Sequence, residues 1–111
     1  MITIQALRDF GADVDAGLAR CLNKEDFYLK MVNLGLADER FESLKGILKS
    51  KDYDAAFEAV HALKGVIANL ALTPISEPIE KMTELLRART DTDYSDLCKE
   101  ITDQRNKLLS L

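Results

Sequence analysis

The sequence predicts an all-α protein, folded as an up-and-down antiparallel four-helix bundle with one or two short extra helices at its N-terminus. Apolar residues recur at intervals of three and four along almost the whole chain, which is the spacing of one face of an α-helix. No segment shows the alternation of apolar and polar residues that is typical of a half-buried β-strand. The connections between the helical segments are short, and short connections favour antiparallel neighbours.

The first two expected helices are short. One covers about residues 3–10 and ends near Gly11. The other covers about residues 14–22, follows Asp13 as its N-cap, and carries Leu18 and Leu22.

Two longer helices are expected next. The first of them, at about residues 24–36, has Asn23 as its N-cap and places Phe27, Met31 and Leu34 on one side. The second, at about residues 38–50, presents Phe41, Leu44 and Leu48.

The fifth expected helix is the longest, at about residues 53–72, with Asp52 as its N-cap. At about 100° per residue, its apolar residues form one broad arc that faces the core. That arc consists of Ala56, Ala59, Val60, Leu63, Val66, Ile67 and Leu70. The opposite stripe points away from the core and consists of Asp54, Phe57, Glu58, His61, Lys64, Gly65, Ala68 and Leu72.

Two helices complete the bundle. Thr73-Pro74 interrupts the helical pattern, so we expect Ser76 to cap the next helix, with Pro78 in its first turn. This helix runs to about residue 90 with Ile79, Met82 and Leu86 inward. After a polar turn, the last helix covers about residues 94–109 and uses Tyr94, Leu97, Ile101 and Leu108.

Composition narrows the possible functions. The length fits one domain over residues 1–111, and its 47% hydrophobic and 31% charged residues are ordinary for a soluble folded protein. The net charge of −4 argues against nucleic acid as a partner. No apolar run approaches the roughly 18 residues of a membrane span, and the first residues lack the features of a signal peptide. Cys21 and Cys98 have no metal-like spacing, so we expect reduced thiols in a cytoplasmic protein.

The most informative feature of the chain is the run Val60-His61-Ala62-Leu63-Lys64-Gly65. His61 is the only histidine in 111 residues. Lys64 and Gly65 lie three and four positions later, so on a helix they neighbour the face of the histidine. Glycine inside a helix costs about 1 kcal/mol relative to alanine, which indicates that something large approaches the imidazole closely. Each residue alone has an ordinary surface or packing interpretation, but together on one stripe they favour a functional site.

This motif resembles the signature of the histidine-containing phosphotransfer (HPt) domain family, in which a histidine is followed by x-Leu-Lys-Gly on a helix of a four-helix bundle. The resemblance spans about residues 13–90. Outside the motif it rests on four other segments, namely Val14 to Leu18, Phe27-Tyr28, Asn69-Leu70 and Ile79 to Met82. The chain departs from the family where it has Val60 for alanine, Ala71 for glycine, and the bulkier Val66 and Ile67 after the glycine. These changes should alter packing more than chemistry.

The resemblance implies that His61 is a phosphoacceptor and that the protein works in a two-component phosphorelay. Neutral imidazole, through Nε2, would take a phosphoryl group from an aspartyl phosphate on a receiver domain and pass it to another receiver. Lys64 would neutralise the phosphoryl oxygens, and Gly65 would leave room for the receiver. The chain would hold no cofactor or metal of its own, because Mg²⁺ and the catalytic lysine would belong to the receiver. It would be a carrier rather than an enzyme, since it has no nucleotide-binding loop.

The same resemblance implies the partners. They would be receiver domains of response regulators, of a hybrid histidine kinase, or of both. Independently of the resemblance, we expect a monomer, and Met1 with a complete bundle favours a stand-alone protein over a domain cut from a hybrid kinase. Phe57, Ala68 and Leu72, with parts of the second and third helices, would form a mostly apolar docking patch around the histidine.

Three other functions share some features with this sequence. A phosphate-independent helical bundle that binds signalling partners, a degenerate HPt fold, remains the alternative. A metal-binding bundle needs Glu-x-x-His pairs on facing helices, and only Glu58 to His61 supplies such a tetrad. A generic coiled coil is disfavoured by the short, interrupted helices.

Overall fold

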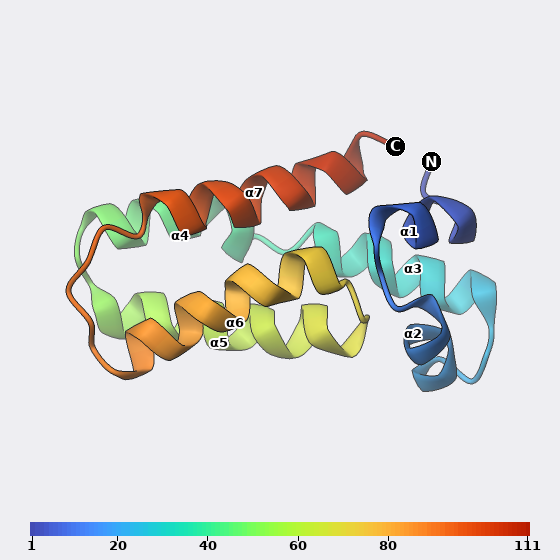
Figure 1. Cartoon of the computed structure of the whole chain (residues 1–111), viewed down its shortest axis with the longest axis horizontal. Helices are drawn as coiled ribbons and strands as arrows, with labels where there is room; N and C mark the ends of the chain where they lie inside the picture. The colour runs from blue at the N-terminus through green and yellow to red at the C-terminus, as the bar shows by residue number, and fades with distance from the viewer.

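Seven α-helices and no β-strand make up the computed structural model, which describes all residues from 1 to 111 (Figure 1). The all-α fold class is therefore confirmed. The helices are α1 (Ile4–Phe10), α2 (Val14–Arg20), α3 (Glu25–Leu36), α4 (Arg40–Lys49), α5 (Tyr53–Asn69), α6 (Thr73–Arg87) and α7 (Ser95–Leu109). None of them is both long and apolar enough to cross a lipid bilayer.

The four C-terminal helices form the bundle. Each packs on the next, from α4 to α5, α6 and α7, and α7 closes the ring by contacting α4. In Figure 1 the helices α1, α2 and α3 lie together at the end of the long axis where the two chain termini are drawn. Three helices thus precede the bundle, of which α1 and α2 are the short ones expected. The two chain ends meet there, where the Met1 amino group donates a hydrogen bond to the carbonyl of Leu111.

Helix α5 is the central element of the core. Its Val60, Leu63 and Ile67 side chains are completely buried, as their spacing predicts. Its most extensive partner is α6, which contributes Ile75, Ile79 and Met82, all completely buried. The expected N-cap of α5 is also confirmed, because the Asp52 carboxylate accepts a hydrogen bond from the Ala55 N–H at 3.1 Å. Asp13 caps α2 in the same way, accepting from Ala16 at 3.3 Å.

The turn between α5 and α6 differs from the sequence prediction. Helix α5 ends at Asn69 rather than at residue 72, because Ala71 takes a left-handed conformation (φ 59°) and turns the chain. Helix α6 begins at Thr73, not after Ser76, and Pro74 lies in its first turn, where proline is tolerated because no N–H partner is lost. Pro78 therefore lies inside the helix instead of in its first turn.

Helix α3 also differs from the prediction. Asn23 does not cap it, since Asn23 is left-handed (φ 56°) and the helix starts after Lys24 without a side-chain cap. The buried face carries Tyr28 and Val32, whereas Phe27 and Leu34 are exposed. Because apolar residues occur on nearly every side of this helix, their spacing alone does not identify the inward face.

Tyr28 fixes α3 in place. Its hydroxyl donates a hydrogen bond of 2.8 Å to the carbonyl of Leu70, just beyond the end of α5. Burial of the ring raises the pKa of Tyr28 to about 12. The ring lies against Gly17 of α2, where an added Cβ would stand 2.5 Å from Tyr28 Cε1. Glycine at position 17 therefore lets α2, α3 and the end of α5 pack together.

We predict that Gly17→Ala destabilises the protein by about 1–3 kcal/mol, because the new methyl group collides with a ring that is packed on all sides. Gly46→Ala is the matched control, since Gly46 lies within α4 and its Cβ would meet no atom within 4 Å. The control should be neutral or gain up to about 1 kcal/mol from helix propensity. Urea unfolding followed by circular dichroism measures both free energies of unfolding. Equal stabilities of the two variants would contradict the role of Gly17.

Candidate functional site

Helix α5 presents His61 to solvent. The neighbouring Val60 and Leu63 are completely buried, so the helix is held by one face and His61 lies on the other. The imidazole makes no hydrogen bond within the protein, and Glu58, one turn earlier, neither bonds nor pairs with it. Both ring nitrogens are thus free to react or to bind a partner.

Lys64 and Gly65 lie next to His61 on the same side of α5. Lys64 is half-buried and forms no ion pair, so its charge is not neutralised by the protein. Gly65 is exposed, and a Cβ placed on it would meet no atom within 4 Å. The glycine is therefore not required for packing inside the protein. It leaves open space beside the imidazole, which agrees with the interpretation of Gly65 as clearance for a partner.

Phe57 lies against His61 in a stacked arrangement. The ring centroids are 5.3 Å apart and the two planes differ by 24°. This geometry is favourable for two aromatic rings and limits the orientations that the imidazole takes. Phe57 is half-buried, so part of the ring remains available at the surface.

Arg87, at the end of α6, completes a row of three side chains. Its guanidinium carbon lies 5.2 Å from the centroid of the Phe57 ring, within the range of a cation–π interaction. The row Arg87–Phe57–His61 places a positive charge beside the site from a second helix. Arg89, two residues beyond the end of α6, forms an ion pair of 2.6 Å with Asp54 of α5. The sequence analysis missed Arg87, because its proximity to Phe57 depends on the register between α5 and α6.

The expected docking patch needs one correction. Ala68 is exposed and Phe57 is half-exposed, but Leu72 is completely buried. Leu72 is wrong as a surface residue because α5 ends before it, and the left-handed turn at Ala71 directs Leu72 into the core as the N-cap of α6. The helical geometry used to predict its position does not apply to Leu72, which lies beyond the end of α5.

The C-terminal end of α5 is tied to α2 and α3. Arg20 donates hydrogen bonds to the carbonyls of Ala68 at 2.9 Å and Asn69 at 3.0 Å. The Ala68 carbonyl also accepts from the Ala71 N–H at 3.0 Å, so Arg20 adds a second donor to it. Arg20 also provides a side-chain donor for the carbonyl of Asn69 at the end of the helix. Gly35 of α3 lies against Leu70 and Val66, where an added Cβ would be 2.7 Å and 3.3 Å from their side chains. Helices α2 and α3 therefore lie beside the same end of α5 as Ala68.

No group of three histidine, cysteine, aspartate or glutamate side chains comes close enough together to hold a metal ion. The tetrad from Glu58 to His61 accordingly has no second set of ligands facing it.

We predict that the stacking of His61 on Phe57 is visible in solution. Protons above an aromatic ring resonate upfield, so Phe57→Leu should move the His61 ring protons downfield towards free imidazole values, while the fold is retained. Phe10→Leu, a change of a half-buried phenylalanine in α1, is the control and should leave these signals in place. Proton–carbon correlation spectra of the single histidine provide the measurement. Unchanged His61 signals in Phe57→Leu would show that the two rings do not stack.

Comparison with known families gives one match. The family model described as "Hpt domain" matches residues 34–110, which include all four bundle helices and the helix that carries His61. Comparisons with curated proteins and with solved structures find no significant match. The match covers more than half of the chain, so the protein belongs to the Hpt domain family.

Proposed function

We propose that the protein is a phosphotransfer protein that accepts a phosphoryl group on His61 from an aspartyl phosphate of a receiver domain and passes it to a second receiver. Hpt domains work in histidine phosphotransfer and interact with receiver domains of two-component systems. The observation that carries the proposal is the exposure of the only histidine beside open space at Gly65, on a helix within the matched region.

The chemistry is a displacement at phosphorus. The lone pair of Nε2 of a neutral imidazole forms an N–P bond while the bond between phosphorus and the aspartate oxygen breaks. The electron pair leaves with the carboxylate, and the reverse step regenerates free imidazole on transfer to the next aspartate. Such transfers depend mainly on in-line positioning and on neutralisation of the phosphoryl oxygens. Phe57 supports the first requirement by holding the imidazole, and Lys64 supports the second with an unpaired charge.

The receiver would supply the remaining parts of the active site. Mg²⁺ and the catalytic lysine would belong to it, and the open space at Gly65 would admit its loops. The docking patch would consist of Phe57 and Ala68 on α5, together with the exposed apolar side chains of α3, Phe27 and Leu34. These α3 side chains take the place of Leu72 in the patch. The protein would act as a cytoplasmic monomer and would neither bind ATP for phosphorylation nor hydrolyse it.

We predict that incubation with a phosphorylated receiver domain from its own cell labels the protein with a phosphoryl group that is labile in acid and stable in alkali, as a phosphoramidate is. His61→Gln should abolish the labelling and leave the melting temperature nearly unchanged, because an exposed side chain contributes little to stability. Lys64→Ala should slow transfer without abolishing it, since the nucleophile remains.

Incubation with ATP and Mg²⁺ alone is the control and should label nothing. Full labelling of His61→Gln would place the acceptor elsewhere. If no phosphorylated receiver of the cell labels the wild-type protein, the phosphate-independent interaction module is the better description.

We predict that Gly65→Gln leaves the fold intact and lowers the rate of transfer by at least about tenfold, because the added side chain fills the space through which the receiver reaches the imidazole. Gly46→Gln is the matched control: Gly46 is also an exposed glycine inside a helix with open space around it, but it lies on α4, away from His61. Quench-flow measurement of phosphoryl transfer gives both rates. Transfer by Gly65→Gln at the rate of the control would refute the clearance interpretation.

A further inference from the structure

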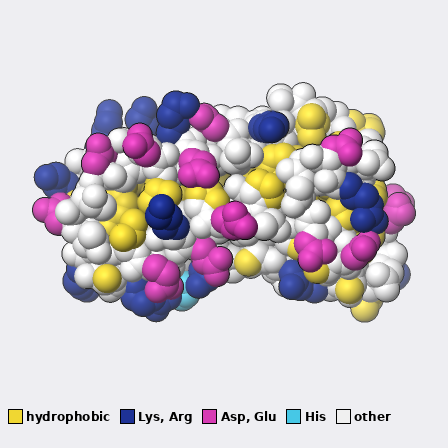
Figure 2. Space-filling view, viewed as in Figure 1, with side chains coloured by type: hydrophobic (Ala, Val, Ile, Leu, Met, Phe, Trp, Pro, Cys, Tyr) yellow, Lys and Arg dark blue, Asp and Glu magenta, His cyan; other side chains and the backbone are white.

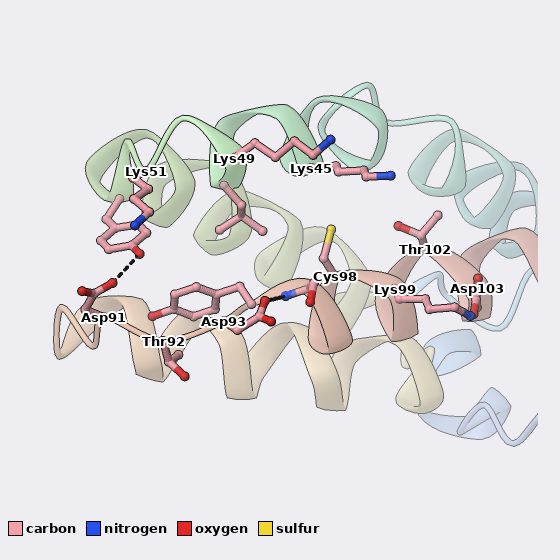
Figure 3. A pocket seen from close by; sticks show the side chains of 14 residues that line it. Lys45, Lys49, Lys51, Asp91, Thr92, Asp93, Cys98, Lys99, Thr102 and Asp103 are labelled. Atoms are coloured by element: carbon pink, nitrogen blue, oxygen red, sulfur yellow. Dashed lines mark hydrogen bonds and ion pairs between the residues drawn. The ribbon is translucent and has the colours of Figure 1, made fainter.

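A cleft of about 800 Å³ opens between α4 and α7, at the end of the bundle away from the chain termini. One wall is α4, with Lys45, Leu48 and Lys49, and the other is α7, from Ser95 to Asp103 (Figure 3). The connection between α6 and α7 closes one end. In Figure 2, basic side chains gather along the upper edge, over α4 and α7, while the histidine lies at the lower edge. The cleft is therefore separate from the site at His61.

The side chains that line this cleft carry a small positive formal charge, with four lysines against three aspartates. All three aspartates that line it are engaged within the protein: Asp91 accepts from the Tyr53 hydroxyl at 2.9 Å, Asp93 accepts from the Ser95 N–H at 2.9 Å, and Asp103 pairs with Lys99 at 2.6 Å. The other lining lysines make no ion pair; they are Lys45, Lys49 and Lys51. These three ammonium groups belong to α4 and the residues directly after it, whereas Asp91 and Asp93 keep their negative charge on the connection between α6 and α7.

The cleft also has an apolar floor. Tyr53 and Tyr94 meet edge to face, with centroids 5.7 Å apart, and Leu48 lies beside them in the lining. Tyr94 is only 4% exposed, so Tyr53, which is half-buried, is the ring of the pair that the cleft presents. Cys98 is buried there, and burial raises the pKa of its thiol, so the sulfur is neutral at physiological pH. Small-molecule sites commonly combine apolar surface with a few convergent polar groups in a volume of this size.

The size of the cationic wall favours a small ligand over a docked helix. Lys45 and Lys49 are four residues apart on α4, which corresponds to about 6 Å along the helix axis. A helix that docks in a groove uses anchors over two turns or more. A cluster of phosphates fits within one turn, and lysine ammonium groups are common phosphate ligands. Figure 3 shows Lys45 and Lys49 on one side of the cleft and Cys98 and Thr102 on the other.

We propose that this cleft binds a small polyphosphate that carries a planar ring, in the class of nucleoside polyphosphates. The phosphates would lie between Lys45, Lys49 and Lys51, and the ring would lie against Tyr53, the part-exposed ring of the tyrosine pair. The proposed site does not depend on the role of His61, and it involves binding without phosphoryl transfer.

The test is a calorimetric titration of the whole protein with ATP at low salt, with amide NMR shifts to locate the bound molecule. We expect one ATP per protein and shifts at cleft residues such as Cys98, with none at His61. Tripolyphosphate, which lacks the ring, should bind at least about tenfold more weakly. The double change Lys45→Gln with Lys49→Gln should weaken ATP binding at least about tenfold. The double change Lys24→Gln with Lys30→Gln, on exposed lysines of the α3 region, is the matched control and should not.

Several results would overturn the proposal. They are the absence of binding at millimolar ATP, equal weakening by the control pair of changes, and tripolyphosphate binding as tightly as ATP. Tighter binding of a glutamate-rich peptide than of ATP would instead identify the cleft as a site for an acidic protein segment. Phosphoryl transfer by the Lys45 and Lys49 double variant should equal that of the wild type. Failure of the cleft proposal is thus distinguishable from failure of the function proposed for His61.

Discussion

The burial of one face of α5 is the constraint on which the rest of the structure depends. Val60, Leu63 and Ile67 are completely buried among α6 and its neighbours, and this contact sets the rotation of the helix about its axis. Successive residues of a helix are related by a fixed rotation. Once these three side chains face the core, His61 and Gly65 therefore face solvent. The exposure of the His61 side chain follows from the packing of its apolar neighbours.

Both ends of α5 are fixed by polar contacts. Asp52 caps its first turn, and Arg20 and Tyr28 bond to carbonyls at its other end. In the proposed phosphotransfer such a rigid support would favour in-line attack by the imidazole, because small displacements of a nucleophile cost large factors in rate. The stacking of Phe57 on His61, with Arg87 on Phe57, extends this support to the side chain itself. Helices α2 and α3 thus help to hold α5 in place although they lie outside the four-helix bundle.

Sequence patterns predicted the parts of the structure that depend on local rules. Helix periodicity predicts the apolar arc of α5 that faces the core and the exposure of His61, and capping preferences predict the caps Asp13 and Asp52. Both kinds of rule act over a few residues. The failures occur where tertiary contacts decide. The spacing groups Phe27, Met31 and Leu34 on one side of α3, but the buried face is the one with Tyr28, which bonds to Leu70. The sequence prediction places Leu72 on the surface because the left-handed turn occurs at Ala71, where no glycine indicates a turn. Arg87 lies near the site because of the register between α5 and α6, and no local sequence pattern predicts that register.

The chemical state of His61 after contact with a phosphorylated receiver is the most direct measure of function. Phosphorus NMR of the protein after this reaction should show one phosphoramidate signal, correlated through bonds with the ring protons of the single histidine. An acyl-phosphate signal, or a phosphoramidate signal without correlation to the His61 ring, would contradict the assignment of His61 as the phosphoacceptor.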